Sequence, residues 1–260
     1  MVRDIRLISA SMQKLSDSEK VPGLSFTLRS KEIQKRFILD INDDIVEDLA
    51  DHCVFYKDTF ELVFQKGDSV ASGRDAEVFS LNSSSLSSLS YIRAREQVIT
   101  VTFKDKLKAT DCGYMFYKFE KLRKINHMEK LDTSEVINMK KMFEDCVVLE
   151  EVDLSGFNTS KVTSMCEMFR SCCSLKSLDL TSFDTSSVND FAWMFNSCNE
   201  LKTIYVTDKF DVSGATYTGG MFEGCLNLVG GNGSTYTDCG LNGDAARFDR
   251  PGQAGYFTEK

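Results

Sequence analysis

The stretch "MFRSCCSLKSLDLTSFDTSSV", residues 168–188, has a near copy one step earlier, "MFEDCVVLEEVDLSGFNTSKV", residues 142–162. Met-Phe pairs begin at five points, and the steps between them are 27, 26, 26 and 27 residues. The pairs begin at Met115, Met142, Met168, Met194 and Met221. Further positions follow the same period, namely Cys146, Cys172, Cys198 and Cys225, and Leu122, Leu149, Leu175, Leu201 and Leu228. A fixed period of this length indicates a tandem repeat.

Each repeat contains two patterns. Leu175, Leu178 and Leu180 alternate with polar residues, as in a strand that buries one side. The triplet 184–186, "DTS", offers side-chain oxygens that cap a helix start, and apolar residues then recur at steps of three and four. These residues are Val188, Phe191, Met194 and Phe195. The pattern predicts a strand followed by a short helix.

A unit this small cannot bury its apolar side alone, so neighbouring units must stack. The predicted fold class is therefore an α/β solenoid of about five right-handed, leucine-rich-repeat-like coils over residues 109–229. Residues 48–108 contain several strand-like runs of alternating polarity and predict a β-rich N-terminal cap. Residues 230–260 are predicted to close the other end, and residues 1–47 form a segment of unclear fold. We expect Phe143, Phe169, Phe195 and Phe222 to form one buried column.

The run "MF..C..L..LDLS.FNTS.VT.M..MF" resembles the leucine-rich repeat of BspA-type bacterial surface proteins, also described as a mycoplasma-type domain of unknown function. Segments outside the repeats, such as "ARFDRPGQAGYFTEK", resemble the same family. Phe191 departs from the family pattern, which has Met there, and "DVSGATYTGGMF" weakens the last capping triplet. The resemblance implies an extracellular, non-catalytic binding role.

Composition limits the function classes. The 260 residues include 42% hydrophobic residues and carry a net charge of −8, which argues against general nucleic-acid binding. No run approaches the roughly 20 apolar residues of a membrane span. The first 20 residues carry charges early and lack a sustained apolar stretch, so they do not predict a signal peptide. The family resemblance implies a cell-surface or secreted protein, whereas this N-terminus leaves a cytoplasmic location as the alternative.

No cofactor, metal site or catalytic site is predicted. The nine cysteines contain no C-x-x-C spacing, and the two histidines lie far apart in sequence. No nucleophile elbow, phosphate-binding loop or dinucleotide motif occurs. Four cysteines follow the repeat period, which predicts a column of buried free thiols, with some disulfide pairing as the alternative. In the pair Cys172-Cys173, we expect one side chain to point inward and the other outward.

The predicted partner site lies on the outward side of the strands. Strand positions 2, 3 and 5 of each repeat should point to solvent and align in rows. These positions are Arg123, Lys124, Asn126, Glu150, Glu151, Asp153, Lys176, Ser177, Asp179, Lys202, Thr203 and Tyr205. The alternative is that basic and acidic rows pair with each other and keep the sheet soluble.

The expected function is recognition or adhesion through this side, with a protein or polymer partner. The family resemblance points to host matrix proteins or other bacterial cells. The alternative is an intracellular or structural scaffold. No nucleic acid and no membrane insertion are expected, and the sequence leaves the oligomeric state open.

Overall fold

The computed structural model describes residues 51–66, 70, 74–81, 86 and 92–260. All described residues belong to the unit Ala50–Lys260. The segment 1–47 that the sequence analysis set apart therefore lies outside the described residues.

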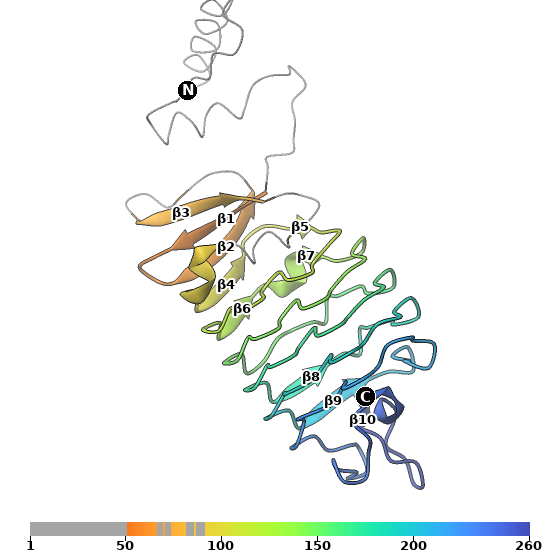
Figure 1. The fold of residues 1–260 in the computed structure, drawn as a ribbon. Coiled ribbons are helices and arrows are strands. Elements are labelled where there is room, and N and C mark those ends of the chain that lie inside the picture. The colour runs from red at the N-terminus through yellow and green to blue at the C-terminus, as the bar shows by residue number, and fades with distance from the viewer. Residues whose placement is uncertain (1–50, 67–69, 71–73, 82–85, 87–91) are drawn as a thin grey trace, which may run out of the picture. The chain divides into compact units, whose positions relative to one another are not determined.

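A five-stranded sheet opens this unit (Figure 1), in the order β3-β1-β2-β4-β6. Its strands are β1 (Asp51–Tyr56), β2 (Glu61–Lys66), β3 (Ala76–Ser80), β4 (Thr100–Phe103) and β6 (Lys124–Asn126). The strand β1 runs antiparallel to β2 and β3, whereas β4 runs parallel to both β2 and β6. Since β6 belongs to the first repeat, this sheet joins the N-terminal strands directly to the repeats.

The strand β1 does not alternate in polarity as the sequence analysis expected. Its residues 53–56 are all buried, because the two sides of the strand face different apolar clusters. Cys53 and Phe55 belong to the main core, while Val54 and Tyr56 form a second cluster with Val63. A strand buried on both sides reads as a continuous apolar run, as seen here.

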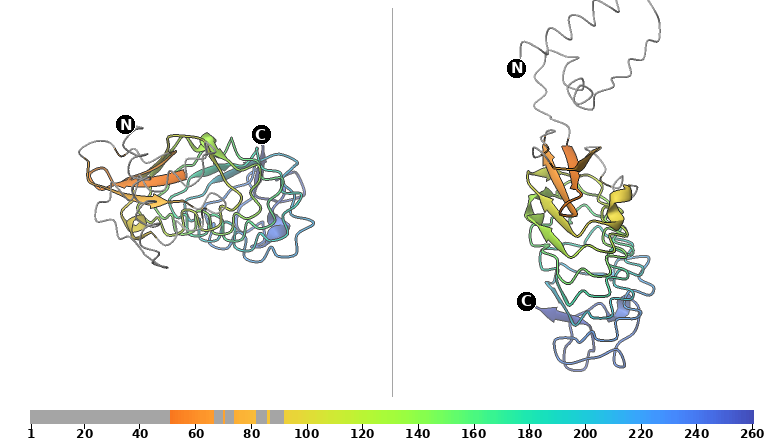
Figure 2. Two further views of the ribbon diagram at one scale, coloured as in Figure 1. Left: turned by 90° about the horizontal axis from the view of Figure 1, so that it is seen from above. Right: turned by 90° about the vertical axis from the view of Figure 1, so that its left-hand side faces the viewer.

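The repeats follow the sheet and are joined by backbone hydrogen bonds between equivalent positions. The Lys176 N–H donates to the Glu150 carbonyl at 3.1 Å, and the Lys202 N–H donates to the Lys176 carbonyl at 2.9 Å. The strands β8 (Ser177–Asp179) and β9 (Thr203–Val206) pair in parallel in register. Figure 2 shows the strands along one side of the repeats and the turns along the other.

The predicted fold class, an α/β solenoid, is wrong. The described residues contain no α-helix, and the 3₁₀ segments whose bounds are described are short, namely η2 (Arg93–Glu96), η3 (Met128–Lys130) and η4 (Gly243–Ala245). The strands form separate sheets of five, three and two strands, the last from β5 (Leu107–Lys108) and β7 (Leu131–Asp132). Residues 150–153 form no strand at all. This part of the chain is sheet, turn and loop.

Residues with a left-handed backbone conformation explain why the predicted helix does not form. In each repeat the residue before the Met-Phe pair and the residue two after it have φ near +60°. In the second repeat these are Lys141 (φ 57°) and Asp145 (φ 60°). A right-handed helix cannot contain such residues, which cost roughly 1–2 kcal/mol each. Every second backbone N–H in this segment donates to a carbonyl of the next repeat instead. For example, the Phe143 N–H donates to the Met168 carbonyl at 2.9 Å.

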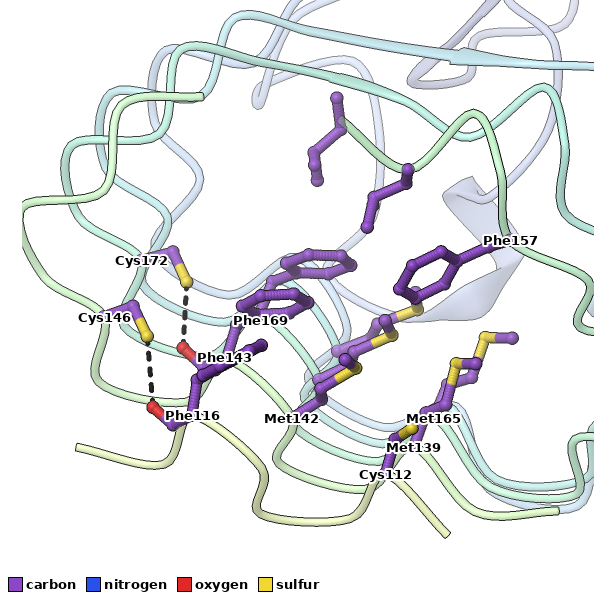
Figure 3. Packing of buried hydrophobic residues seen from close by; sticks show 14 of the residues in the cluster. Cys112, Phe116, Met139, Met142, Phe143, Cys146, Phe157, Met165, Phe169 and Cys172 are labelled. Carbon is purple, nitrogen blue, oxygen red and sulfur yellow. Dashed lines mark hydrogen bonds between the residues drawn. The ribbon is translucent and has the colours of Figure 1, made fainter. Parts of the chain in front are cut away.

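The predicted phenylalanine column is confirmed. Neighbouring rings of the Met-Phe pairs stack with centroids 5.4–5.9 Å apart and interplanar angles of 3–28°. All five rings are fully buried, and Figure 3 shows the first three of them. The column continues into the N-terminal sheet, where Phe64 lies edge-on to Phe116 with ring centroids 6.5 Å apart.

A column of thiols lies beside the rings, as predicted. Cys146 donates to the Phe116 carbonyl at 3.2 Å, and Cys172 donates to the Phe143 carbonyl at 3.2 Å (Figure 3). Cys198 and Cys225 repeat this contact at 3.0 Å and 2.9 Å. All nine cysteines are free thiols. Burial raises the pKa of the Cys146, Cys172 and Cys198 thiols, so they do not ionise at neutral pH.

The cysteines should therefore fall into two classes by their reactivity toward a thiol reagent, half-buried and buried. Cys173 and Cys239 are half-buried, whereas the other seven are buried, so a thiol reagent should label at most these two in the folded protein. Cys172 and Cys173 point inward and outward as expected. After denaturation without reductant, mass spectrometry should find all nine labelled. A single labelled cysteine would instead mean four disulfides.

The polar triplets close turns between repeats and do not cap helices. The Thr159 hydroxyl donates to the Asp184 carbonyl and accepts from the Asp184 N–H, both at 2.8 Å. Within the next triplet, the Asp184 carboxylate accepts the Ser186 N–H at 3.1 Å. Equivalent carboxylate contacts occur at Asp132 and Asp211, and in the second repeat the Asn158 amide oxygen accepts the Ser160 N–H at 3.1 Å. In the last repeat Val212 replaces the threonine.

These turns make stability depend on pH. Hydrogen bonds from Ser134 and Ser186 lower the pKa of Asp132 and Asp184. A carboxylate with a lowered folded pKa stabilises the fold above its unfolded pKa, about 3.9, and this stability is lost as pH falls through the folded value. We expect Tm to be nearly level from pH 7 to pH 5 and to fall steeply below about pH 4.

A matched control comes from the chain itself, which has Asn158 at the position of Asp184. Asp184→Asn should keep the turn and reduce the fall in Tm at acid pH. A Tm that is the same at pH 3 and pH 7 in the parent protein would contradict this account.

The C-terminal segment packs against the last repeat. The strand β10 (Phe257–Glu259) pairs in parallel with β9 and occupies the strand position after it (Figure 1). Phe257 and Tyr256 are buried, and both rings contact Phe222 at the end of the column, with centroids 6.2 Å and 4.7 Å away. On the turn side, the Phe222 N–H donates to the Leu241 carbonyl at 2.9 Å.

Candidate binding face

The predicted partner residues lie on the outward side of the strand segments, which we call the strand face. In β8, Leu178 is buried while Ser177 is exposed, and in β9, Ile204 is buried while Thr203 is half-exposed. This alternation arises because successive side chains of a strand point to opposite sides. Exposed positions are Arg123, Lys124, Glu150, Glu151, Asp153, Lys176, Ser177 and Lys202. Partly exposed positions are Asn126, Asp179, Thr203 and Tyr205.

Strand register brings some of these side chains into rows. Asn126 lies opposite Thr102, and its amide donates to the Thr102 hydroxyl at 3.0 Å. That hydroxyl donates in turn to the Glu61 carboxylate at 2.6 Å. Asp179 lies opposite Tyr205 in the pair β8–β9. The row of polar side chains therefore begins in the N-terminal sheet and continues along the repeats.

Part of the charge on the strand face is paired. This agrees with the alternative prediction that basic and acidic rows pair with each other. The Lys176 ammonium pairs with the Glu150 carboxylate of the preceding repeat, which lowers the pKa of Glu150. The Lys260 ammonium pairs with Asp179 and lies 5.3 Å from the centre of the Tyr205 ring. Burial alone would raise the pKa of Asp179, but hydrogen bonds from Lys260 and Thr181 outweigh it and lower the pKa.

The remaining charges are available to a partner. Among the described residues, Arg123, Lys124, Glu151 and Lys202 form no ion pair. Glu151 and Asp153 are exposed beside Glu150 in the segment that forms no strand. The strand face thus presents basic groups from the first and fourth repeats and acidic groups from the second.

The turn side carries an ionic cluster that was not predicted from the sequence. The Lys141 ammonium lies 2.8 Å from the Glu144 carboxylate and 3.0 Å from the Glu167 carboxylate. Arg170 contacts the same two carboxylates, at 3.5 Å and 2.5 Å. Both glutamate side chains are more than nine-tenths buried. The cluster joins the second repeat to the third. The sequence feature that could have indicated it is the presence of charged residues beside successive Met-Phe pairs.

No group of three or more His, Cys, Asp or Glu side chains in the described residues is arranged to hold a metal ion. Within that same part of the chain, no helix has the length and apolar character needed to cross a membrane.

One family model matches the repeat segment. Residues 110–232, which include all five Met-Phe pairs, match the family described as "Mycoplasma protein of unknown function, DUF285". This agrees with the mycoplasma-type resemblance of the repeat motif. No curated protein matches the chain.

One solved structure is similar in part. It is a leucine-rich cell surface protein from Faecalibacterium prausnitzii A2-165, with 16% sequence identity and a TM-score of 0.37. The match covers 70% of this chain and 52% of that protein, so the chain spans about half its length.

Proposed function

We propose that this protein is a non-catalytic recognition module that binds a protein or polymer partner through the strand face. The observation that carries the proposal is the alignment of exposed side chains from adjacent repeats on one side of the strands. Arg123, Lys124, Glu151 and Lys202 have no ion pair among the described residues, so partner contacts at these positions would replace water alone.

The BspA-type resemblance of the repeats supports adhesion as the form of this recognition. Host matrix proteins or the surface of other bacterial cells are the proposed partners, and the cell surface is the proposed location. A repeat array suits this role because each added repeat extends the row of outward side chains.

A structural scaffold inside the cell is the second candidate. The pairs Lys176–Glu150 and Asp179–Lys260 favour it, because they use strand-face charge to hold neighbouring segments together. Exposed pairs of this kind contribute at most about 1 kcal/mol each, so a partner could displace them at a small energetic cost.

Protease treatment of intact source cells distinguishes the two candidates. An adhesion module should be cleaved at the surface of intact cells, with loss of the full-length chain on an immunoblot. A cytoplasmic marker protein should stay intact in the same sample. Protection of this chain until the cells are lysed would remove the adhesion proposal and leave the scaffold.

A further inference from the structure

The turn side of the last two repeats carries exposed apolar side chains that the strand face lacks. Trp193 is 46% exposed, Tyr217 is 61% exposed, and Leu241 is also exposed. Exposed tryptophan and tyrosine are the residues that most often dominate binding at protein interfaces. We call Trp193, Tyr217, Glu223 and Leu241 the Trp193 patch.

Backbone hydrogen bonds place the three segments that carry these residues next to one another. The Trp193 N–H donates to the Gly219 carbonyl at 3.0 Å, and the Phe191 N–H donates to the Tyr217 carbonyl at 2.7 Å. Leu241 joins them from the closing segment through the Phe222 N–H. The patch therefore exists only where the fourth repeat, the fifth repeat and the closing segment meet.

A glycine makes room for the indole. A side-chain carbon at Gly220 would lie 2.5 Å from both Cδ1 and Nε1 of Trp193, a distance too short for any other residue. The same point lies 3.4 Å from the Glu223 Oε2 atom. The indole and the Glu223 carboxylate therefore lie beside each other above the glycine.

The segments that carry the patch are mostly acidic. From 177 to 246 the chain has nine acidic residues and two basic ones, Lys202 and Lys209. Lys176, just before this stretch, pairs with Glu150, and Arg247, just after it, donates to the Ala254 carbonyl at 2.8 Å. Lys202 lies on the strand face, and Lys209 lies beside Asp184. In the described part of the chain, no cation pairs with Glu223 or lies over the Trp193 ring. The repeats before the patch differ, since Lys141 and Arg170 occupy their turns.

We infer that the Trp193 patch is a second binding surface, separate from the strand face, and that it takes an arginine- or lysine-bearing segment of a protein partner. A guanidinium or ammonium group over the indole would gain a cation–π contact, for which tryptophan is the best ring. The Glu223 carboxylate beside the ring would pair with the same group. Tyr217 and Leu241 would cover the apolar stem of the bound side chain.

The chain's only tryptophan makes a direct test possible. Titration with a capped hexa-arginine peptide at about 0.15 M salt, where the Debye length is about 8 Å, should change the Trp193 emission in a saturable way. A hexa-serine peptide should leave the emission unchanged. An unchanged emission with hexa-arginine would overturn the proposal, as would an emission change with a neutral oligosaccharide alone.

Variants separate the patch from general attraction to an acidic protein. Anisotropy of a labelled hexa-arginine peptide should show about three- to tenfold weaker binding for Glu223→Gln and for Trp193→Leu. The matched controls Glu200→Gln and Leu226→Ala change exposed residues outside the patch and should bind as the parent does. Equal weakening by Glu200→Gln and Glu223→Gln would contradict the proposal, because binding would then follow net charge alone.

Discussion

Replacing Phe169 by alanine should lower the free energy of unfolding by about 3–5 kcal/mol, the range for a fully buried phenylalanine. Its ring stacks between those of Phe143 and Phe195, with centroids 5.5 Å and 5.9 Å away, and it has no exposed surface. Because the cavity would open in the middle of the column, both neighbouring repeats would lose packing. Urea unfolding followed by circular dichroism measures the change.

Ile137→Ala serves as the control, since it removes an apolar side chain that is 56% exposed. Its effect should stay within about 0.5 kcal/mol. Equal unfolding midpoints for Phe169→Ala and the parent protein would show that the ring column does not hold the repeats together.

Replacing Lys141 by methionine should cost about 3–5 kcal/mol, as when one partner of a buried ion pair is removed. The ammonium is the near neighbour of two carboxylates, Glu144 and Glu167, whose side chains are only 7% and 8% exposed. Burial opposes the ammonium charge, but the two carboxylates outweigh this effect and raise the pKa of Lys141. Without it, Glu144 would keep only Arg170, at 3.5 Å.

Lys161→Met provides a matched comparison, because the Lys161–Glu135 pair also joins neighbouring repeats but is half exposed. Its loss should cost no more than about 1 kcal/mol. If the two lysine variants unfolded at the same urea concentration, burial of the Lys141 cluster would not contribute to stability.

The repeat period predicted the core but not the local backbone. Buried side chains are spaced three to four residues apart at 188, 191, 194 and 198. Over so short a stretch, a helix and a series of three-residue turns produce the same spacing. The deciding feature is the left-handed backbone at Lys141, Asp145 and their equivalents, and none of these side chains signals it. Only the last repeat has glycine at both positions, Gly220 and Gly224, where the left-handed conformation could have been expected.

The strand face was predictable for the same reason that the core was. Alternation of apolar and polar residues in 175–180 decides which side chains point outward, whether or not the segment pairs as a regular strand. The ion pairs were not predictable, because Lys260 reaches Asp179 from 81 residues away. The Trp193 patch also escaped sequence reasoning, since it depends on how Gly220 and Leu241 meet the fourth repeat.

Binding through the strand face is the central claim, and one comparison of variants tests it most directly. A Glu150/Glu151/Asp153 triple alanine variant removes three exposed carboxylates from the strand face. A Glu96/Glu120/Asp208 triple alanine variant removes the same charge from exposed positions outside it. Both should keep the parent's circular dichroism spectrum, because none of these side chains is buried.

The measurement is the amount of partner that each immobilised protein retains from extracts of host matrix or bacterial surface. The account predicts that the strand-face variant loses the partners retained by the parent protein, while the control variant keeps them. Undiminished retention by the folded strand-face variant would contradict the claim that the protein binds through this face.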